Sequence, residues 1–183
     1  MHIVLAKFGS ISQSEAHFIL NILYETFDRL QPHDRELVDV FLFERNSSLS
    51  AYLEQEHERS GVVSNRFDDD FFAMHDAWRG IPRISVSLER VKRLPQQVIV
   101  GALRHEVGHA VLHGEVSYYV LPTPKAFENL DASKKYVADL LYLTSIAVKD
   151  YEVTRLLTSR GFEEDQRAYV DHLLTPSDED TTT

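Results

Sequence analysis

Hydrophobic residues recur at two spacings along the chain, and each spacing predicts a different kind of element. Short runs or alternations of hydrophobic residues predict strands at residues 2–8, 36–44 and 81–89. Hydrophobic residues spaced three or four apart predict helices at residues 10–31, 47–61, 91–114, 126–157 (with room for one break) and 163–174. Strands and helices mix without a regular strand–helix–strand rhythm, so we predict an α+β fold.

The segment 81–89, IPRISVSLE, alternates most regularly. Its apolar side holds Ile84, Val86 and Leu88, and its polar side holds Arg83, Ser85, Ser87 and Glu89. Pro82 lacks a backbone N–H, which favours the edge of a sheet. We therefore predict a half-buried edge strand here. In the preceding segment, FDDDFFAMHDAWRG, the run Asp68–Asp70 predicts a solvated loop.

The predicted helix at residues 91–114 contains the sequence HEVGH. His105 and His109 stand four apart, so they project from the same side of the helix one turn apart. Two neutral imidazoles can bind Zn²⁺ and leave room for a third protein ligand and a water. Glu106 leans past such a metal and can accept a proton from the activated water. The pattern HExxH thus predicts a zinc hydrolase site with Glu106 as the general base.

Three other residues of this helix bear on the site. Gly101 and Gly108 lie on one line of the helix, where each costs about 1 kcal/mol, and this indicates that another backbone packs closely there. His113 lies about 12 Å from His105 along a continuous helix, so it cannot bind the same metal unless the helix breaks. Metzincins break the helix at a glycine, but here that position is Leu112. We interpret His113 as a last-turn histidine that interacts favourably with the helix dipole.

The sequence HEVGHAVLH, followed by an acidic helix, resembles the gluzincin clan of zinc metallopeptidases, especially its small minigluzincin-like members. It also resembles the neutral zincin regulators of the ImmA/IrrE type. The resemblance covers residues 80–160. In these families a downstream helix supplies an acidic ligand in a pattern like E-x-x-A-[DN], and the nearest match here is DYEVT, residues 150–154. That match has Asp for Glu, Val for Ala, and Thr for Asp or Asn.

The resemblance implies a zincin-like fold and a third ligand. The fold would be a small mixed sheet with an edge strand above the HExxH helix, and residues 81–89 are the expected strand. An extended peptide substrate would pair with that strand. The third zinc ligand would be Asp150. The zincin-like catalytic domain is expected to span residues 1–174, followed by a disordered acidic tail over residues 175–183.

Helical phase separates Asp150 from Glu152, which is the alternative third ligand. The more apolar side, on which Asp150 falls, holds Leu143, Ile146, Ala147 and Leu157. A carboxylate on that side is costly unless it is paired or bound to a metal. Glu152 lies on a mixed side, with Lys149 and Arg155 three residues away as ion-pair partners. We therefore predict Asp150 as the third ligand.

Composition narrows the partners and the location. The chain has 19 Lys and Arg against 29 Asp and Glu, and the net charge of −10 argues against nucleic acid and anionic membranes as partners. There is no cysteine, so disulfides are excluded. The chain begins without a basic and apolar leader and contains no run of roughly 18 apolar residues, so we expect a cytoplasmic protein without a membrane span.

Together these observations predict a zinc-dependent metallopeptidase that acts on peptides or unstructured proteins. The alternative is a zincin-fold, metal-binding regulatory module with little general hydrolytic activity. A metal-dependent hydrolase of non-peptide substrates would use the same residues. The presence of Glu106 favours an enzyme, because metal storage needs no base there. Tyr118, Tyr119 and His172 are candidate stabilisers of an oxyanion, and no particular oligomeric state is predicted.

Overall fold

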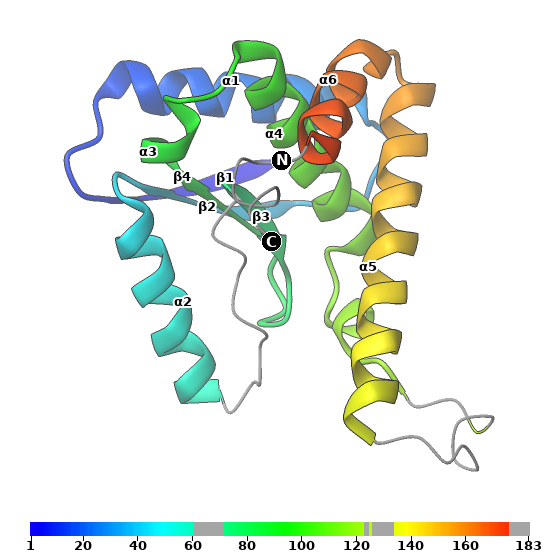
Figure 1. Ribbon diagram of the computed structural model, residues 1–183. Coiled ribbons are helices and arrows are strands. Elements are labelled where there is room, and N and C mark those ends of the chain that lie inside the picture. The colour runs from blue at the N-terminus through cyan, green and yellow to red at the C-terminus, as the bar shows by residue number, and fades with distance from the viewer. Residues whose placement is uncertain (61–71, 123–124, 126–133, 176–183) are drawn as a thin grey trace.

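The computed structural model describes residues 1–60, 72–122, 125 and 134–175. The elements, in chain order, are β1 (His2–Phe8), α1 (Gln13–Arg29), β2 (Leu37–Phe43), α2 (Asn46–Ser60), β3 (Ala73–Asp76), β4 (Arg83–Ser87), α3 (Leu88–Val91), α4 (Gln96–His113), η1 (Val116–Tyr119), α5 (Lys134–Ser159) and α6 (Glu163–Leu174). This is an α+β architecture, as predicted (Figure 1). The run Asp68–Asp70, the start of the predicted helix at 126–157 and residues 176–183 of the predicted tail lie outside the described residues.

The sheet has four strands in the order β1-β2-β4-β3. The pairs β1–β2 and β2–β4 are parallel, and β3–β4 is antiparallel, so the sheet is mixed. The predicted edge position of residues 81–89 is therefore wrong: β4 pairs on both sides and is buried along its whole length. Pro82 permits this because it joins the sheet through its carbonyl, which accepts the Asp39 N–H at 2.9 Å. The strand at this edge is β3, in a segment whose pattern predicts no strand.

The two faces of the sheet are covered by different helices (Figure 1). The main hydrophobic core joins the sheet to α1 and α4 through residues such as Leu23, Phe27, Val40, Ile84 and Leu103. A smaller core on the other face joins α2 to β2 through Phe43, Leu49 and Leu53. Alternation along β4 therefore sends its apolar side chains to α1 and α4 and its polar ones to α2, where they are buried as well.

Helix α4 is held in place by α5 and α6. A Cβ atom on Gly101 would collide with the backbone oxygen of Asp165 in α6. A Cβ atom on Gly108 would lie 2.6 Å from Val153 Cγ1 in α5. The predicted close approach of another backbone is confirmed at Gly101, whereas at Gly108 the close contact is with a side chain. Because α5 and α6 approach so closely, their side chains can reach the histidines of α4.

Helix α5 is the longest element and is only partly packed. Near its C-terminal end, Val153 and Leu157 are fully buried against the core. Nearer its N-terminal end, Leu143 and Ile146 are exposed. Figure 1 shows this end of the helix extending away from the sheet. Within the described residues, no helix is both long and apolar enough to cross a membrane.

Candidate metal centre

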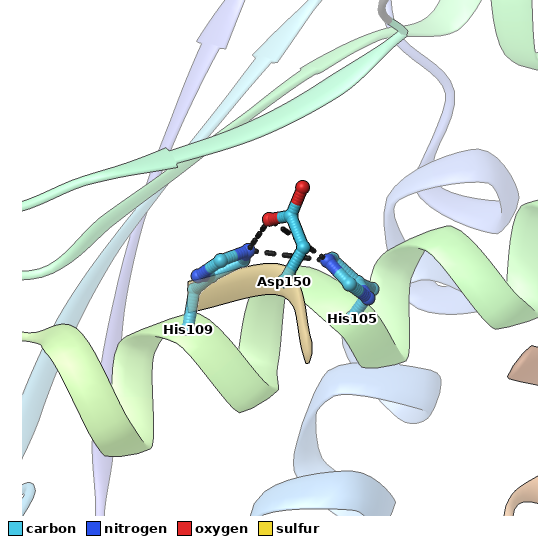
Figure 2. Close-up of side chains that lie close together, drawn as sticks. All are labelled: His105, His109 and Asp150. Carbon is cyan, nitrogen blue, oxygen red and sulfur yellow. Dashed lines mark hydrogen bonds and ion pairs between the residues drawn. The ribbon is translucent and has the colours of Figure 1, made fainter. Parts of the chain in front are cut away.

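Three side chains from α4 and α5 converge on one point (Figure 2). His109 Nε2 lies 3.1 Å from His105 Nε2 and 3.1 Å from Asp150 Oδ1. His105 Nε2 lies 3.6 Å from the same oxygen. Ligand atoms at the corners of a tetrahedron around zinc, with bonds of about 2.0–2.1 Å, stand roughly 3.3 Å apart. The observed spacing therefore fits a tetrahedrally bound ion, and this group could hold a metal.

The structure brings together His105, His109 and Asp150, and it keeps Glu152 apart from them. Asp150 nevertheless joins the histidines for a different reason from the one that the helical phase suggested. Its side chain is 49% exposed, so it is not a carboxylate forced into the core. The apolar side of α5 on which it lies is exposed at Leu143 and Ile146. Asp150 reaches the site because α5 packs against α4 about one helical turn further along α5, where Val153 lies against Gly108.

His105 is oriented by Gln166, a buried residue of α6. Gln166 Nε2 donates a hydrogen bond to the Gly101 carbonyl at 2.9 Å, so its Oε1 faces His105 Nδ1 at 3.2 Å. His105 therefore donates from Nδ1 to Gln166, and its Nε2 faces Asp150. The sequence reasoning missed Gln166. The sequence signal that could have identified Gln166 is its spacing of three residues from Tyr169. Tyr169 is also buried, and its ring centroid lies 5.3 Å from that of His105.

His113 lies behind His109 as seen from the metal centre. It is fully buried, with Nδ1 3.1 Å from His109 Nδ1 and Nε2 3.0 Å from Glu152 Oε2. It occupies the last turn of α4, as predicted, but both of its ring nitrogens are engaged by side chains. The predicted pairing of Glu152 with Lys149 is wrong, because the Lys149 amine donates to the Tyr118 carbonyl at 2.7 Å.

Glu106 is a buried carboxyl beside the two histidines. Burial raises its pKa to about 7 because the charged form is poorly solvated. The charge of Asp150 raises the pKa further, while His105 and a hydrogen bond from the His75 backbone lower it. The carboxyl is therefore suited to both accept and release a proton near neutral pH.

The protonation states of the converging groups suit a metal. Burial lowers the pKa of His109 to about 4, although the nearby Asp150 opposes this. Burial also acts to lower the pKa of His105, but Asp150 and Glu106 outweigh it and the pKa is raised. The pKa of Asp150 is lowered, because its hydrogen bonds with both histidines outweigh the effect of burial. At neutral pH the site thus presents a carboxylate and at least one neutral imidazole, and metal binding favours the neutral form of the other.

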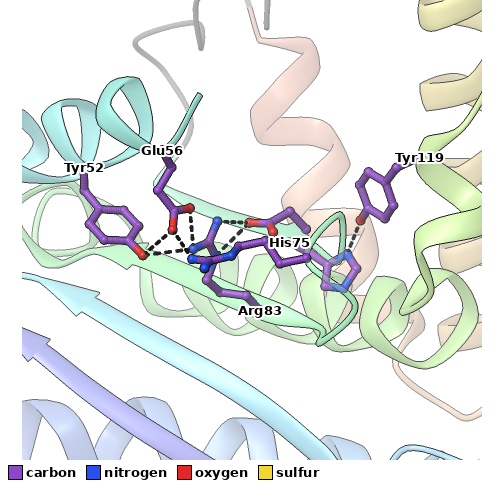
Figure 3. A network of polar contacts seen from close by, with 7 residues as sticks. Tyr52, Glu56, His75, Arg83 and Tyr119 are labelled. Carbon is purple, nitrogen blue, oxygen red and sulfur yellow. Dashed lines mark hydrogen bonds and ion pairs between the residues drawn. The ribbon is translucent and has the colours of Figure 1, made fainter. Parts of the chain in front are cut away.

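Strand β3 lies against α4 and carries His75, which Figure 3 shows beside the Tyr119 hydroxyl. The His75 ring stacks on that of His109, with centroids 6.0 Å apart, and its Nδ1 lies 3.1 Å from the Tyr119 hydroxyl. That hydroxyl also accepts a hydrogen bond from the Ala77 backbone. Among the other candidate oxyanion stabilisers, Tyr118 packs its ring 5.0 Å from that of His113, and His172 is exposed at the end of α6.

The antiparallel pairing leaves alternate backbone groups of β3 directed away from β4. Ser87 N–H donates to the Phe72 carbonyl at 2.8 Å, so residue 72 directs its backbone groups toward β4. The backbone N–H and carbonyl groups of residues 73, 75 and 77 therefore point away from β4, out of the sheet edge. Two of these outward N–H groups are already engaged, by Glu106 at His75 and by Tyr119 at Ala77. The outward carbonyl of His75 lies between them.

No family model, curated protein or solved structure matches the chain. Function is therefore inferred from the site itself. That site combines two imidazoles that face each other, one half-exposed carboxylate and one buried carboxyl.

Proposed function

We propose that the chain is a zinc-dependent metallopeptidase of the zincin type. In this proposal His105, His109 and Asp150 hold the zinc ion, and Glu106 is the general base. The convergence of three ligand atoms beside a buried carboxyl of raised pKa is the observation that carries the proposal. Imidazole with carboxylate is a ligand set that suits zinc, whereas calcium and magnesium prefer sites made of oxygen.

The number of ligands favours catalysis over a purely structural ion. Structural zinc sites are closed by four protein ligands, and catalytic ones have three and an open position. Among the residues that the structure describes, three side chains converge, and the side of the site at Asp150 is open to solvent. In this proposal the two imidazoles are neutral, and the carboxylates of Asp150 and Glu106 carry negative charge. A divalent cation would balance that charge.

The chain's own residues then have separate roles in hydrolysis. A bound zinc ion would supply Lewis-acid polarisation of the scissile carbonyl and lower the pKa of the attacking water. Glu106 takes the proton from that water and passes it to the leaving amine nitrogen. Gln166 and His113 hold the imidazoles in place. An extended peptide is proposed to lie along β3 and donate an N–H to the outward carbonyl of His75.

The decisive experiment separates the base from the ligands. The zinc-loaded chain is expected to hydrolyse casein, an unstructured protein, and Glu106→Gln should retain zinc and lose hydrolysis. Purified parent protein is expected to carry about one zinc ion per chain. His109→Ala should lose both the zinc and the hydrolysis, because it removes a ligand. Elemental analysis and release of soluble peptides provide the two measurements. Equal hydrolysis by the parent and Glu106→Gln would overturn the role of the base.

A second experiment addresses the third ligand. Zinc affinity is measured by competition with a chromogenic chelator for Asp150→Ala and Glu152→Ala. Asp150→Ala should lose most of the affinity, and Glu152→Ala should lose less, because Glu152 lies against His113 and not at the converging atoms. Greater loss in Glu152→Ala would reverse the assignment.

A metal-binding regulatory module with little hydrolytic activity is the second candidate, and one contact favours it. The Tyr119 hydroxyl occupies the outward N–H of Ala77, so a peptide pairing along β3 would have to displace the phenol there. If that contact prevents substrate binding, the parent would bind zinc and leave casein intact, whereas Tyr119→Phe, which lacks the contact, would be expected to hydrolyse casein. Hydrolysis by the parent excludes this second candidate.

A further inference from the structure

Strand β1 forms the edge of the sheet opposite β3, and its outer side pairs with no other described strand. All of its residues pair with β2 in one continuous register, without a bulge. Natural proteins protect edge strands by making them short, bulged or charged, or by placing proline in them. The sequence of β1, HIVLAKF, has no proline, and Lys7 near its end is its one Lys, Arg, Asp or Glu. The edge is therefore suited to pair with another strand.

The two edges of the sheet differ in this respect. Strand β3 is short, and two of its outward N–H groups are engaged by the side chains of Glu106 and Tyr119. Strand β1 is longer, and in the part of the chain that the structure describes no hydrogen bond engages its outer backbone groups. The molecule thus occupies one edge with its own side chains and leaves the other edge available to a partner.

The pairing with β2 shows which backbone groups of β1 point outward. His2 N–H donates to the Glu36 carbonyl at 2.7 Å, so His2 directs its backbone groups toward β2. Successive residues of a strand direct these groups to opposite sides. The N–H and carbonyl groups of Ile3, Leu5 and Lys7 therefore point out of the sheet edge, and Leu5 is the middle one of the three.

Apolar side chains are exposed on both faces of this edge. Val4 is 50% exposed and Leu5 is 36% exposed. Ile3 packs against the core beneath α1 and α4, whereas Phe8 packs against the core beneath α2. Because side chains alternate along a strand, Leu5 lies on the first face and Val4 on the second. A strand added beside β1 would cover apolar surface on both faces.

We propose that β1 is a dimerisation edge, which pairs antiparallel with β1 of a second copy of the chain about a two-fold axis at Leu5. In this register Leu5 lies opposite the partner's Leu5, and Ile3 lies opposite the partner's Lys7. Residues that face each other through outward groups exchange two backbone hydrogen bonds in an antiparallel pair. Every outward N–H and carbonyl of both strands is then satisfied.

The charges on β1 favour this register and a second copy as the occupant. An axis at Lys7 would place two ammonium groups directly opposite each other, which is unfavourable, and would leave other outward groups unpaired. The chain has a net charge of −10, but β1 contains no acidic residue, so the paired strands bring no carboxylates opposite each other. Closed two-fold contacts are also the commonest symmetry of homo-oligomers.

Such a dimer would leave both candidate metal centres accessible. The two sheets would join into one, with a β3 strand at each outer edge. Neighbouring strands lie about 4.8 Å apart, so the two β3 strands would be roughly 34 Å apart across the joined sheet. The dimer therefore requires neither the metal nor hydrolysis, and a chain without either could still form it.

Sedimentation equilibrium of the full chain, with a chelator present so that zinc cannot bridge copies, measures the association. We expect a monomer–dimer equilibrium of micromolar affinity, because the paired edges are small. Leu5→Asp would place two carboxylates opposite each other at the axis and should weaken the dimer about tenfold or more. Leu173→Asp, the same change at a leucine of α6 that is 52% exposed, is the matched control and should dimerise as the parent does.

Three results would overturn the proposal. They are a parent chain that stays monomeric from micromolar to millimolar concentration, a parent chain that forms species larger than a dimer, and equal dimerisation of Leu5→Asp and the parent. Circular dichroism of Leu5→Asp checks that the variant is folded.

Introduced thiols test the register without removing the interface. The chain has no cysteine, so one new thiol is unique. In Leu5→Cys the two thiols would face each other across the axis, on Cα atoms about 5.5 Å apart, and a short bifunctional thiol reagent should link them. In Lys7→Cys, on the same face of β1, the two Cα atoms would be offset by roughly 14 Å along the strands, beyond the reach of the reagent. Linking of Lys7→Cys, or failure of Leu5→Cys to link, would overturn the proposal.

Discussion

Two polar clusters lie on opposite sides of β3, and they are balanced in different ways. Figure 3 draws the cluster around Arg83, and Figure 2 draws the candidate metal centre. Consecutive residues of the strand, His75 and Asp76, point to opposite faces of the sheet. On the α2 side, Arg83 forms ion pairs with Asp76 at 2.9 Å and with Glu56 at 2.6 Å. On the α4 side, His75 stacks over His109 at the candidate metal centre.

The Arg83 cluster is complete without a ligand. A buried guanidinium lies between two carboxylates, Tyr52 donates to Glu56 at 2.7 Å, and Arg79 pairs with Glu56 from the surface. At the candidate metal centre, by contrast, Asp150 and Glu106 interact with imidazoles and backbone, and within the described residues no salt bridge joins them to a lysine or arginine. Buried charges that balance one another hold elements together, whereas the converging ligand atoms of His105, His109 and Asp150 could hold a cation.

The largest effect that this comparison predicts is on stability. Arg83→Met removes the cation and leaves Glu56 and Asp76 buried without it, which should lower the free energy of unfolding by about 3–5 kcal/mol. Arg79→Met, at a side chain that is 62% exposed and pairs with the same Glu56, should cost no more than about 1 kcal/mol. Urea unfolding at neutral pH measures both. Equal losses would mean that the network is not held by its buried cation.

The second prediction concerns Glu106 in metal-free protein. Its pKa of about 7 in the folded state lies above the ordinary value of 4.5, so the folded state holds the proton more tightly. The stability due to this group is thus fully present below about pH 4.5 and is lost as the pH rises through about 7. Glu106→Gln cannot titrate, so its stability relative to the parent should increase by up to roughly 3 kcal/mol from pH 5 to pH 8.

Urea unfolding in the presence of a chelator, at both pH values, measures this difference. The control is Glu164→Gln, whose side chain is exposed and should leave the pH dependence of the parent unchanged. A constant difference between Glu106→Gln and the parent would show that burial does not disfavour the charged carboxylate.

The third prediction distinguishes the clusters by their response to zinc. Free Zn²⁺ at 100 times its dissociation constant should stabilise the parent by about 2.7 kcal/mol, because it binds the folded state alone. His109→Ala should gain nothing under the same conditions. Arg79→Met should gain as much as the parent, since it alters only the other cluster. Thermal or urea unfolding with and without zinc measures the gains, and an equal gain in His109→Ala would remove that residue from the site.

Local spacing predicted most of the elements and the centre of the site. Helix α1 begins with a capping box in which Ser12 and Glu15, three residues apart, exchange hydrogen bonds. The spacing of His105 and His109 depends only on helix geometry, so it needed no tertiary information. These features share one property, which is that all of their partners lie within four residues along the chain.

Features that depend on distant partners were predicted poorly. The polar side of β4 was interpreted as solvent-facing, but Arg83 is buried because Glu56, 27 residues earlier, pairs with it. Strand β3 spans Ala73–Asp76, too few residues for alternation to be recognised. Gln166 has its role only because Gly101 allows α6 to approach. The first two relations leave no periodic signal in the sequence, and the spacing of Gln166 from Tyr169 does not reveal which residues Gln166 contacts.

The smallest expected effect concerns Tyr119, which borders both β3 and the metal centre. Tyr119→Phe removes its hydrogen bonds with His75 and Ala77 and should cost about 0.5–1.5 kcal/mol of stability. Tyr118→Phe, at an exposed ring, is the control and should cost less.

The kinetic consequence of Tyr119→Phe depends on what the Tyr119 hydroxyl does. If it only occupies the outward N–H of Ala77, its removal frees that donor for a pairing peptide, so KM should fall while kcat is retained. If it stabilises the oxyanion, kcat should fall at unchanged KM. The contact with Ala77 favours the first outcome, and steady-state cleavage of an extended peptide by the zinc-loaded variant decides between them.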